Sequence, residues 1–410
     1  CNFNSNKNEL HLFKKGVQGL YLGLSGDGLM FASDVYGIIE FCRYFYPVHN
    51  NECFKFKKIS KFSLNNFKYD VDILNKNISK TITFNDFKKT IITSRDIDKK
   101  EFNFFLEKEI YDTEDIVSST INRYVQKLSS KKQIEYEFAI SEDQVPSVIS
   151  KNLYQKKIKK IILTGMGTCY TAAVAISHYM RLILKNIFPD IVIEPNIASE
   201  GSGFYLETDM SDTLVIVIAQ SGTTIDTNIY AKMAKERGAF SLAIANKREG
   251  DITFIVDGTL YIGEGRDIEI SVPSTKTYTA QVLLGYILSL YFLNLFKEKQ
   301  TIKKIILGEI GKIMLCPNIV KDSFKCLDKI SILEKSDLNF LKHSSWLVAF
   351  DDSENSVCAS EIRIKLSETC YQAVPYLNIE QVVSYNIKNS FITYLSNKNL
   401  NDLEKEVEKL

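Results

Sequence analysis

Apolar runs in the middle of the chain alternate with segments in which apolar residues recur every three or four positions. Residues 159–164 form a run that predicts a buried strand, and the pattern over residues 170–184 predicts an amphipathic helix. The same alternation of strand and helix continues across residues 150–300. It predicts a doubly wound parallel sheet with helices on both faces, a three-layer α/β/α fold.

The segments before this region have other patterns. Residues 1–95 alternate apolar and polar positions between turn residues, which predicts antiparallel strands, with a helix near residues 36–45. Residues 100–150 are rich in charge, and the helical spacing of apolar residues over 116–128 predicts that this part is helical. A small α+β domain and a helical linker are therefore expected before the α/β region.

Beyond residue 300 the pattern is first helical and then similar to the middle of the chain. Residues 345–350 and 390–395 predict strands, and residues 359–371 predict a helix between them. This order is that of the opening half of a second α/β domain, so the chain contains a weak internal repeat. The predicted domains are 1–95 (α+β), 96–150 (helical linker), 151–300 (first α/β domain) and 301–410 (partial second α/β domain).

Charge and hydropathy exclude some partners. The 51 basic and 50 acidic residues nearly cancel, so no global field attracts nucleic acid or an anionic membrane. The longest apolar stretch, residues 282–296, is shorter than the about 20 residues that cross a bilayer and predicts a buried helix. The first twenty residues contain no secretory signal. We therefore expect a cytoplasmic protein.

The cysteines and histidines predict no special chemistry. The eight cysteines include no Cys-x-x-Cys pair, which is typical of reduced thiols in the cytosol. The four histidines are scattered and lack the spacing of a zinc site. We therefore expect neither a metal nor a cofactor.

Hydroxyl and glycine residues follow three of the predicted strands, where each strand turns into a helix. They lie at residues 165–169, 219–224 and 272–276. Such turns gather at the carboxyl ends of a parallel sheet, and helix N-termini add unpaired N–H groups and partial positive charge. One such turn alone is more often a plain N-cap, but three in series predict a pocket for a small phosphorylated metabolite.

These residues resemble the sugar isomerase (SIS) domain of the glutamine:fructose-6-phosphate aminotransferase family, which makes glucosamine 6-phosphate. The motifs follow the family's order over about residues 150–300. Two upstream segments resemble the end of the family's glutaminase domain, and a third resembles the start of its linker. The matching segments are 166–170, 197–200, 220–222 with 226–227, and 269–281 in the SIS domain, 19–24 and 31–34 in the glutaminase part, and 108–111 in the linker.

The resemblance implies a glutamine amidotransferase of hexosamine biosynthesis that aminates fructose 6-phosphate and isomerises the product. Residues 1–95 would be the C-terminal part of an N-terminal-nucleophile, glutaminase-like domain, and residues 301–410 a partial, divergent second SIS domain. SIS domains usually pair, so a homodimer is expected. The residues implied to bind the sugar phosphate are Gly167, Thr168, Cys169, Gln220, Ser221, Gly222, Thr224, Val272 and Ser274.

The segment from Glu361 to Glu368 resembles the family's Glu-x-x-x-Lys-x-x-Glu helix. By this resemblance Glu368 is the general base that moves a proton between C1 and C2, and Lys365 contacts the sugar hydroxyls. Positions i and i+3 share a helix face, so both side chains can meet one substrate. Without the family context, the same pair is more simply a surface ion pair on an amphipathic helix.

The chain departs from the family pattern at several positions. Cys169 and Ala219 replace serines, so two hydroxyl donors are lost and weaker phosphate binding is expected. Residues 350–352 replace the family's Gly-Arg-Gly, and residues 379–384 lack the histidine that assists ring opening. The sequence also stops before the family's tail lysine, which holds the open sugar as a Schiff base. No residue of this sequence is therefore predicted to open the sugar ring or to form the Schiff base.

Cys1 invites comparison with the family's N-terminal nucleophile, but the residues after it do not follow the family's Cys-Gly-Ile-Val-Gly opening. We therefore expect either an incomplete reading frame or a paralogue that has lost ammonia production. Two other functions stay open: a non-catalytic sugar-phosphate-binding SIS protein, and a SIS deglycase acting on an amine-linked sugar phosphate.

Overall fold

The contacts in the computed structural model of the protein divide the chain into two units, Cys1–Lys100 and Glu101–Leu410. The domain boundaries within the second unit stay predictions. The structure describes residues 2–7, 9–15, 19–26, 28–57, 68–73, 78–90, 97–129, 134–248, 250–265, 267–325, 344–382 and 390–395.

The first unit contains two antiparallel sheets, as the alternating pattern predicts. They enclose aromatic and aliphatic side chains, among which Leu12, Leu22 and Phe54 are fully buried. One sheet has the order β1-β2-β6-β7-β8 and the other β4-β3-β5-β9. The strands are β1 (Asn2–Asn4), β2 (Glu9–Phe13), β3 (Tyr21–Leu24), β4 (Leu29–Ala32), β5 (Tyr44–Pro47), β6 (Glu52–Lys57), β7 (Lys68–Ile73), β8 (Ile78–Thr83) and β9 (Lys88–Lys89).

The prediction of a helix near residues 36–45 is wrong. Only a single 3₁₀ turn forms there, η1 (Val35–Gly37), with Asp34 as its N-cap. The end of the predicted range belongs instead to β5, which pairs antiparallel with β3. Strand pairing buries Phe45 and Tyr46, and this tertiary gain outweighs the weak local helical pattern.

The second unit is built on a parallel sheet of five strands with the order β13-β12-β14-β15-β16. Its central strand, β14 (Thr213–Ala219), is buried along its whole length. Leu214, Ile216 and Ile218 face one core cluster, while alternate residues such as Val215 and Val217 face another. The other strands are β12 (Lys160–Gly165), β13 (Val192–Ile197), β15 (Phe240–Ala245) and β16 (Gly258–Tyr261).

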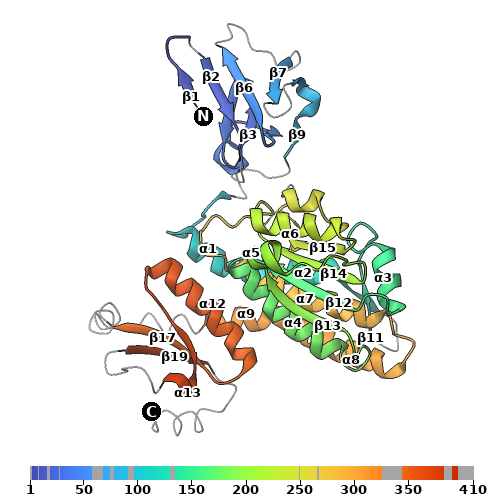
Figure 1. Ribbon diagram of the computed structural model, residues 1–410. Coiled ribbons are helices and arrows are strands. Elements are labelled where there is room, and N and C mark those ends of the chain that lie inside the picture. The colour runs from blue at the N-terminus through green and yellow to red at the C-terminus, as the bar shows by residue number, and fades with distance from the viewer. Residues whose placement is uncertain are drawn as a thin grey trace. The chain divides into compact units, whose positions relative to one another are not determined.

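Helices cover both faces of this sheet, as Figure 1 shows. On one side the core includes residues of the long helices α4 and α7, and on the other side it includes residues of α5 and α6. The predicted three-layer α/β/α fold is therefore confirmed. The helices are α1 (Phe105–Tyr111), α2 (Thr113–Tyr124), α3 (Ser147–Tyr154), α4 (Thr168–Leu184), α5 (Ala198–Glu200), α6 (Ile225–Glu236), α7 (Lys276–Asn294), α8 (Gln300–Ile313) and α9 (Cys316–Phe324), with the short turns η5 (Gly201–Tyr205) and η6 (Asp251–Phe254).

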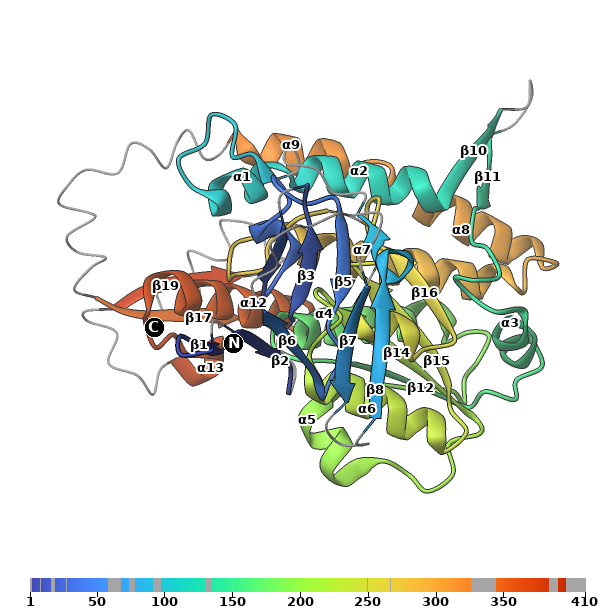
Figure 2. The same cartoon turned by 90° about the horizontal axis from the view of Figure 1, so that it is seen from above.

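The prediction of helix over residues 116–128 is wrong at its end. Helix α2 stops at Tyr124, and β10 (Val125–Ser129) pairs antiparallel with β11 (Ile134–Phe138). Figure 2 shows this hairpin directly after α2. The Tyr124 hydroxyl exchanges hydrogen bonds with the backbone of Tyr261, which fixes the point where the helix ends. The strand that pairs with β10 is β11, which lies outside residues 116–128, and so the helical spacing of those residues could not reveal the pairing.

The last part of the chain contains a parallel sheet with the order β18-β17-β19. Its strands are β17 (Ser345–Phe350), β18 (Tyr376–Asn378) and β19 (Ser390–Leu395). The strands expected at 345–350 and 390–395 are therefore confirmed. Helix α12 (Ser353–Cys370) includes most of the expected helix, and α13 (Ile379–Val382) is a single turn. Within the described part of the chain, no helix has both the length and the apolar character needed to cross a membrane.

Helices α4 and α7 approach each other closely at Gly285, and this contact yields a prediction. A Cβ atom at Gly285 would lie 2.4 Å from Ile176 Cγ1, whereas one at Gly308 of α8 would meet nothing within 4 Å. Gly285→Ala should therefore lower the free energy of unfolding by about 1–3 kcal/mol through overpacking. Urea denaturation measures the change.

Gly308→Ala is the matched control, because alanine favours helix over glycine and has free space there. It should raise the free energy of unfolding by about 0.5–1 kcal/mol. A stabilising Gly285→Ala substitution would show that α4 and α7 lie further apart.

Candidate functional site

The first turn of the site joins β12 to α4. Gly167 adopts a positive φ of 55°, a conformation that costs glycine little. A side chain at Gly165 would collide with the backbone of Cys169, because a Cβ atom there would lie 2.7 Å from its carbonyl carbon. The two glycines therefore let the strand turn sharply and place Thr168 and Cys169 at the start of α4.

The second turn joins β14 to α6 and has an open helix N-terminus. Gly222 has a φ of 70°, and a Cβ atom there would lie 2.8 Å from the Gly250 Cα atom. The Ser221 and Thr223 hydroxyl oxygens are 3.0 Å apart. Thr224 is the N-cap of α6, but its side chain makes no capping hydrogen bond. The end of α6 therefore has no side-chain cap and can accept an anion, although the Ser221 and Thr223 hydroxyls bond to each other and Asp226 lies in the first turn of the helix.

The third turn precedes α7 and is closed by an internal carboxylate. Glu269 accepts hydrogen bonds from the Ser274 hydroxyl (2.8 Å) and the Thr275 backbone N–H (2.7 Å). A longer bond of 3.4 Å comes from the Thr277 N–H. Because Glu269 already occupies the N-terminus of α7, this turn offers an anion less than the second turn does. Val272, at the tip of the loop, has 88% of its surface exposed.

The three turns meet around Cys169. Its Sγ atom lies 3.8 Å from Gln281 Nε2 of α7. The pKa of the Cys169 thiol is raised to about 11, mainly by burial; hydrogen bonds from Gln281 and from the Gln220 backbone oppose the rise, and the carboxylates of Glu269 and Glu361 add to it. One thiol thus has neighbours on the second turn, the third turn and α12, and it is protonated at neutral pH.

Helix α12 brings Lys365, one of the two predicted catalytic residues, to the first turn. Lys365 Nζ donates a hydrogen bond of 3.0 Å to Thr168 Oγ1, and Thr168 Oγ1 donates one of 3.1 Å to Glu361 Oε1. Lys365 also forms ion pairs with Glu361 at 3.2 Å and with Glu368 at 3.0 Å. Lys365 therefore contacts the glycine turn, although Thr168 and Lys365 are 197 positions apart, and Glu368 is connected to it through Lys365.

Glu361 also belongs to this cluster, although the sequence predicted no role for it. Burial raises the pKa of its carboxyl group, against the lowering effects of Lys365 and Thr168, and the Glu368 charge adds to the rise. Its Oε2 atom is buried and has no hydrogen-bond partner. The i, i+4 spacing from Lys365 could have pointed to it, but only the packing of α12 on α4 buries it.

Other predicted residues are less connected. The described contacts join neither Thr224 nor Val272 to the cluster around Cys169, although both lie on turns that contribute to it. Cys1 lies outside the described residues, as do residues 383 and 384 of the segment without a histidine. In the described part of the chain, no group of three or more His, Cys, Asp and Glu residues could hold a metal.

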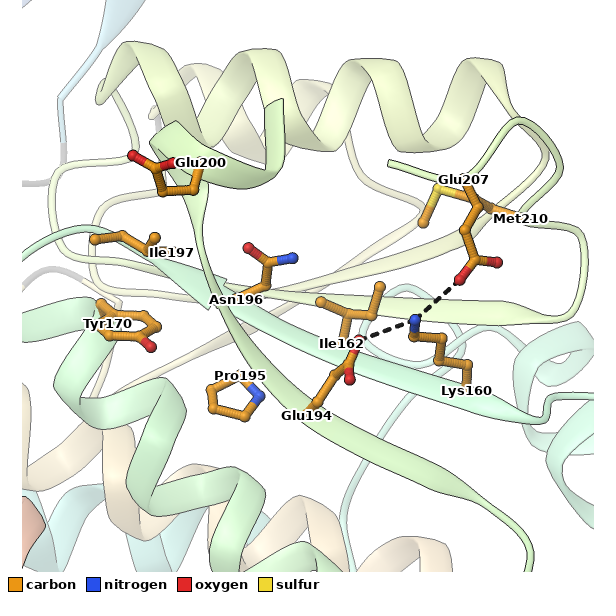
Figure 3. A pocket seen from close by; sticks show the side chains of 10 residues that line it. All are labelled: Lys160, Ile162, Tyr170, Glu194, Pro195, Asn196, Ile197, Glu200, Glu207 and Met210. Carbon is orange, nitrogen blue, oxygen red and sulfur yellow. Dashed lines mark hydrogen bonds and ion pairs between the residues drawn. The ribbon is translucent and has the colours of Figure 1, made fainter. Parts of the chain in front are cut away.

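A separate cavity of about 520 Å³ lies beside the edge strand β13. Lys160 forms ion pairs across it with Glu194 (2.9 Å) and Glu207 (3.0 Å), as Figure 3 shows. Glu200 also lines the cavity. With three carboxylates and one ammonium group, this cavity repels a phosphate, so it does not replace the turns as the candidate anion site.

Residues 153–291 match the family model of the SIS domain. The predicted resemblance to a SIS domain is therefore confirmed for these residues. The glycine turn of β12, the Ser221 turn and most of α7 lie within the matched residues.

The relatives make the comparison more specific. The chain is 33% identical over 246 residues to the glutamine–fructose-6-phosphate aminotransferase of Fusobacterium nucleatum, covering 55% of this chain and 35% of that protein. It is 29% identical over 319 residues to the enzyme of the same name from Clostridium tetani, covering 77% of this chain and 46% of that protein. The matched regions thus span about a third to a half of these relatives.

A solved structure confirms the fold. The C-terminal domain of glucosamine-fructose-6-phosphate aminotransferase from Francisella tularensis superposes with a TM-score of 0.57 at 21% identity, covering 76% of this chain and 82% of that one. At this identity the likeness concerns the fold.

The pKa of Glu361 predicts a pH dependence. Its folded-state pKa lies above the ordinary value of 4.5, so the unfolded chain releases the proton first as the pH rises. The free energy of unfolding should therefore fall from about pH 4.5 up to the raised pKa, by about 1.4 kcal/mol for each pH unit between the two pKa values. Glu361→Gln, which stays neutral, should escape this loss in urea denaturation between pH 4 and 7.

Glu380→Gln serves as the control, because Glu380 is exposed on α13. The difference in free energy of unfolding between this variant and the wild type should not change with pH in this way. A pH-independent difference between Glu361→Gln and the wild type would contradict the buried, charge-disfavouring environment of Glu361.

Proposed function

We propose that the chain binds a hexose 6-phosphate, fructose 6-phosphate or glucosamine 6-phosphate, and belongs to the glutamine-dependent aminotransferase and isomerase machinery of hexosamine biosynthesis. The observation that carries the proposal is the meeting of three strand-to-helix turns and α12 around Cys169 and Thr168. The names of the relatives support the same substrate class.

The phosphate binds at the second turn. The Ser221 and Thr223 hydroxyls and the uncapped N-terminus of α6 supply short donors and partial positive charge. The third turn contacts the sugar instead, because the Glu269 carboxylate, which already binds the Ser274 hydroxyl, disfavours a second anion there, while Val272 is exposed at the tip of the loop. A dianionic phosphate at one end and a neutral sugar at the other match this charge distribution.

The isomerisation is carried out by α12. Glu368 is the general base for the proton that moves between C1 and C2, and Lys365 orients the sugar hydroxyls. The Glu361 carboxyl group, with its raised pKa, holds Lys365 and Thr168 in place.

We propose a cytoplasmic homodimer, and the exposed apolar side chains of Leu315, the N-cap of α9, and of Ile319 on α9 support association between copies. A second candidate function is a non-catalytic binder of the same sugar phosphates. It is favoured by the ion pairs that already engage Lys365 with Glu361 and Glu368.

Ligand binding is the first test. Isothermal titration calorimetry with fructose 6-phosphate and glucosamine 6-phosphate should give saturable binding, whereas unphosphorylated fructose should bind far more weakly. Ser221→Ala should weaken the binding of both phosphates about 2- to 12-fold, which corresponds to one hydrogen bond of about 0.5–1.5 kcal/mol.

Ser147→Ala is the control for that substitution. Ser147 is an exposed residue at the start of α3. Its neighbour Pro146 lies beside Gly258, the first residue of β16, so Ser147 is near the amino ends of the strands, whereas the candidate site is at their carboxyl ends. Its replacement should leave all affinities unchanged. If the wild-type chain binds neither sugar phosphate, the proposed function is wrong.

Proton exchange separates the two candidate functions. In D₂O the wild-type chain should exchange a C1 proton of fructose 6-phosphate, observed by proton NMR, because isomerisation begins with its removal. Glu368→Gln should slow the exchange by about 10²-fold or more with the sugar phosphate still bound. Glu380→Gln should have no effect. Binding without exchange in the wild type would support the non-catalytic binder.

A further inference from the structure

Helix α1 contacts the loop before α7, far away in the sequence. Glu109 of this helix is 2% exposed. Its Oε1 atom accepts hydrogen bonds from the backbone N–H groups of Ile270, at 2.5 Å, and Ser271, at 3.2 Å. The loop has no strand to satisfy these N–H groups. A buried carboxylate therefore performs the task that a neighbouring strand performs elsewhere in the sheet.

The same linker segment holds the other end of the loop. Asp112, the residue after α1, accepts a hydrogen bond of 3.0 Å from Lys276 Nζ and is also paired with Lys108. Lys276 is 4% exposed and is the first residue of α7. Burial opposes the charge of Asp112, but the two lysines outweigh it and lower its pKa.

Between these two anchors the loop is ordered from within. Glu269 binds the Ser274 hydroxyl and the Thr275 N–H, which leaves Val272 as the exposed tip. The tip therefore has its position set by three carboxylates, those of Glu109, Asp112 and Glu269, and the first two belong to the linker. The linker begins next to the boundary between the two units of the chain.

We propose that Glu109 and Asp112 form a latch by which the linker positions the loop of residues 269–276 for ligand binding. Glu109 and Asp112 are thus positioning residues: they act through the loop and do not touch the ligand. The role in binding rests on the proposed function, whereas the ordering of the loop does not.

The proposed latch and a merely structural role of Glu109 predict different effects on ligand binding. The Ser221 turn receives no hydrogen bond from α1 among the described contacts. Loss of the latch should therefore weaken recognition of the sugar while leaving recognition of the phosphate group intact. Inorganic phosphate and fructose 6-phosphate are the two probes that separate these effects.

Hydrogen–deuterium exchange of the ligand-free full chain tests the latch directly. Glu109→Gln should speed exchange in peptides covering residues 269–277 about tenfold and leave peptides covering β14 and the Ser221 turn unchanged. Glu107→Gln is the matched control, since Glu107 is an exposed carboxylate on the same helix. Unchanged exchange of the loop in Glu109→Gln would overturn the proposal.

Calorimetry then tests the role in binding. Glu109→Gln should weaken fructose 6-phosphate binding about tenfold and change inorganic phosphate binding less than twofold. An equal loss for both ligands, or a loss for neither, would overturn the positioning role. If Glu109→Gln does not fold, Asp112→Asn releases the Lys276 end of the same loop and should give the same ratio of effects.

The two hypotheses fail in different ways. If the wild type binds no sugar phosphate, the proposed function is wrong, and the exchange measurement still decides whether α1 orders the loop. If the wild type binds but the Glu109 variant matches it in exchange and affinity, the latch alone is wrong.

Discussion

The candidate site depends on one close approach, that of Gly165 at the end of β12 to Cys169 in the first turn of α4. This contact lets the chain reverse direction within a few residues and sets two neighbouring side chains in different directions. Thr168 meets Lys365 and Glu361 of α12, while Cys169 meets Gln281 of α7 and the backbone of Gln220. A larger residue at position 165 would move both sets of contacts at once.

The site is also organised by buried carboxylates, each of which has a partner that offsets the cost of removing its charge from water. Glu269 is satisfied by hydroxyl and backbone donors of its own loop, and Glu109 by two backbone N–H groups. Glu361 is the exception, because one of its oxygens has no partner and its pKa is raised. Hydrogen bonds from the loop thus satisfy the Glu269 carboxylate at the third turn. On α12, one oxygen of Glu361 has no such partner.

This distribution explains why three similar sequence motifs need not have the same role. The turns before α4 and α6 directly follow β12 and β14, the turn before α7 ends a longer loop after β16, and all three carry hydroxyl groups. Only the turn before α6 combines hydroxyls with an uncapped helix N-terminus and no carboxylate bound to it among the described contacts. The ends of the other two helices are engaged by α12 and by Glu269.

The sequence by itself determined the parallel sheet, its helices and the position of the turns, because two-sided burial demands unbroken apolar strands such as β14 and glycine is needed where φ is positive, as at Gly167 and Gly222. Local patterns failed at η1 and at the end of α2, where pairing with another strand outweighed local helical spacing. The sequence also placed Lys365 and Glu368 on one helix face, but it gave no sign of the burial of Glu361 or of the bonds from Glu109 to Ile270 and Ser271. Those depend on contacts between segments more than 150 residues apart, and only the packed tertiary structure decides which distant groups a buried charge will meet.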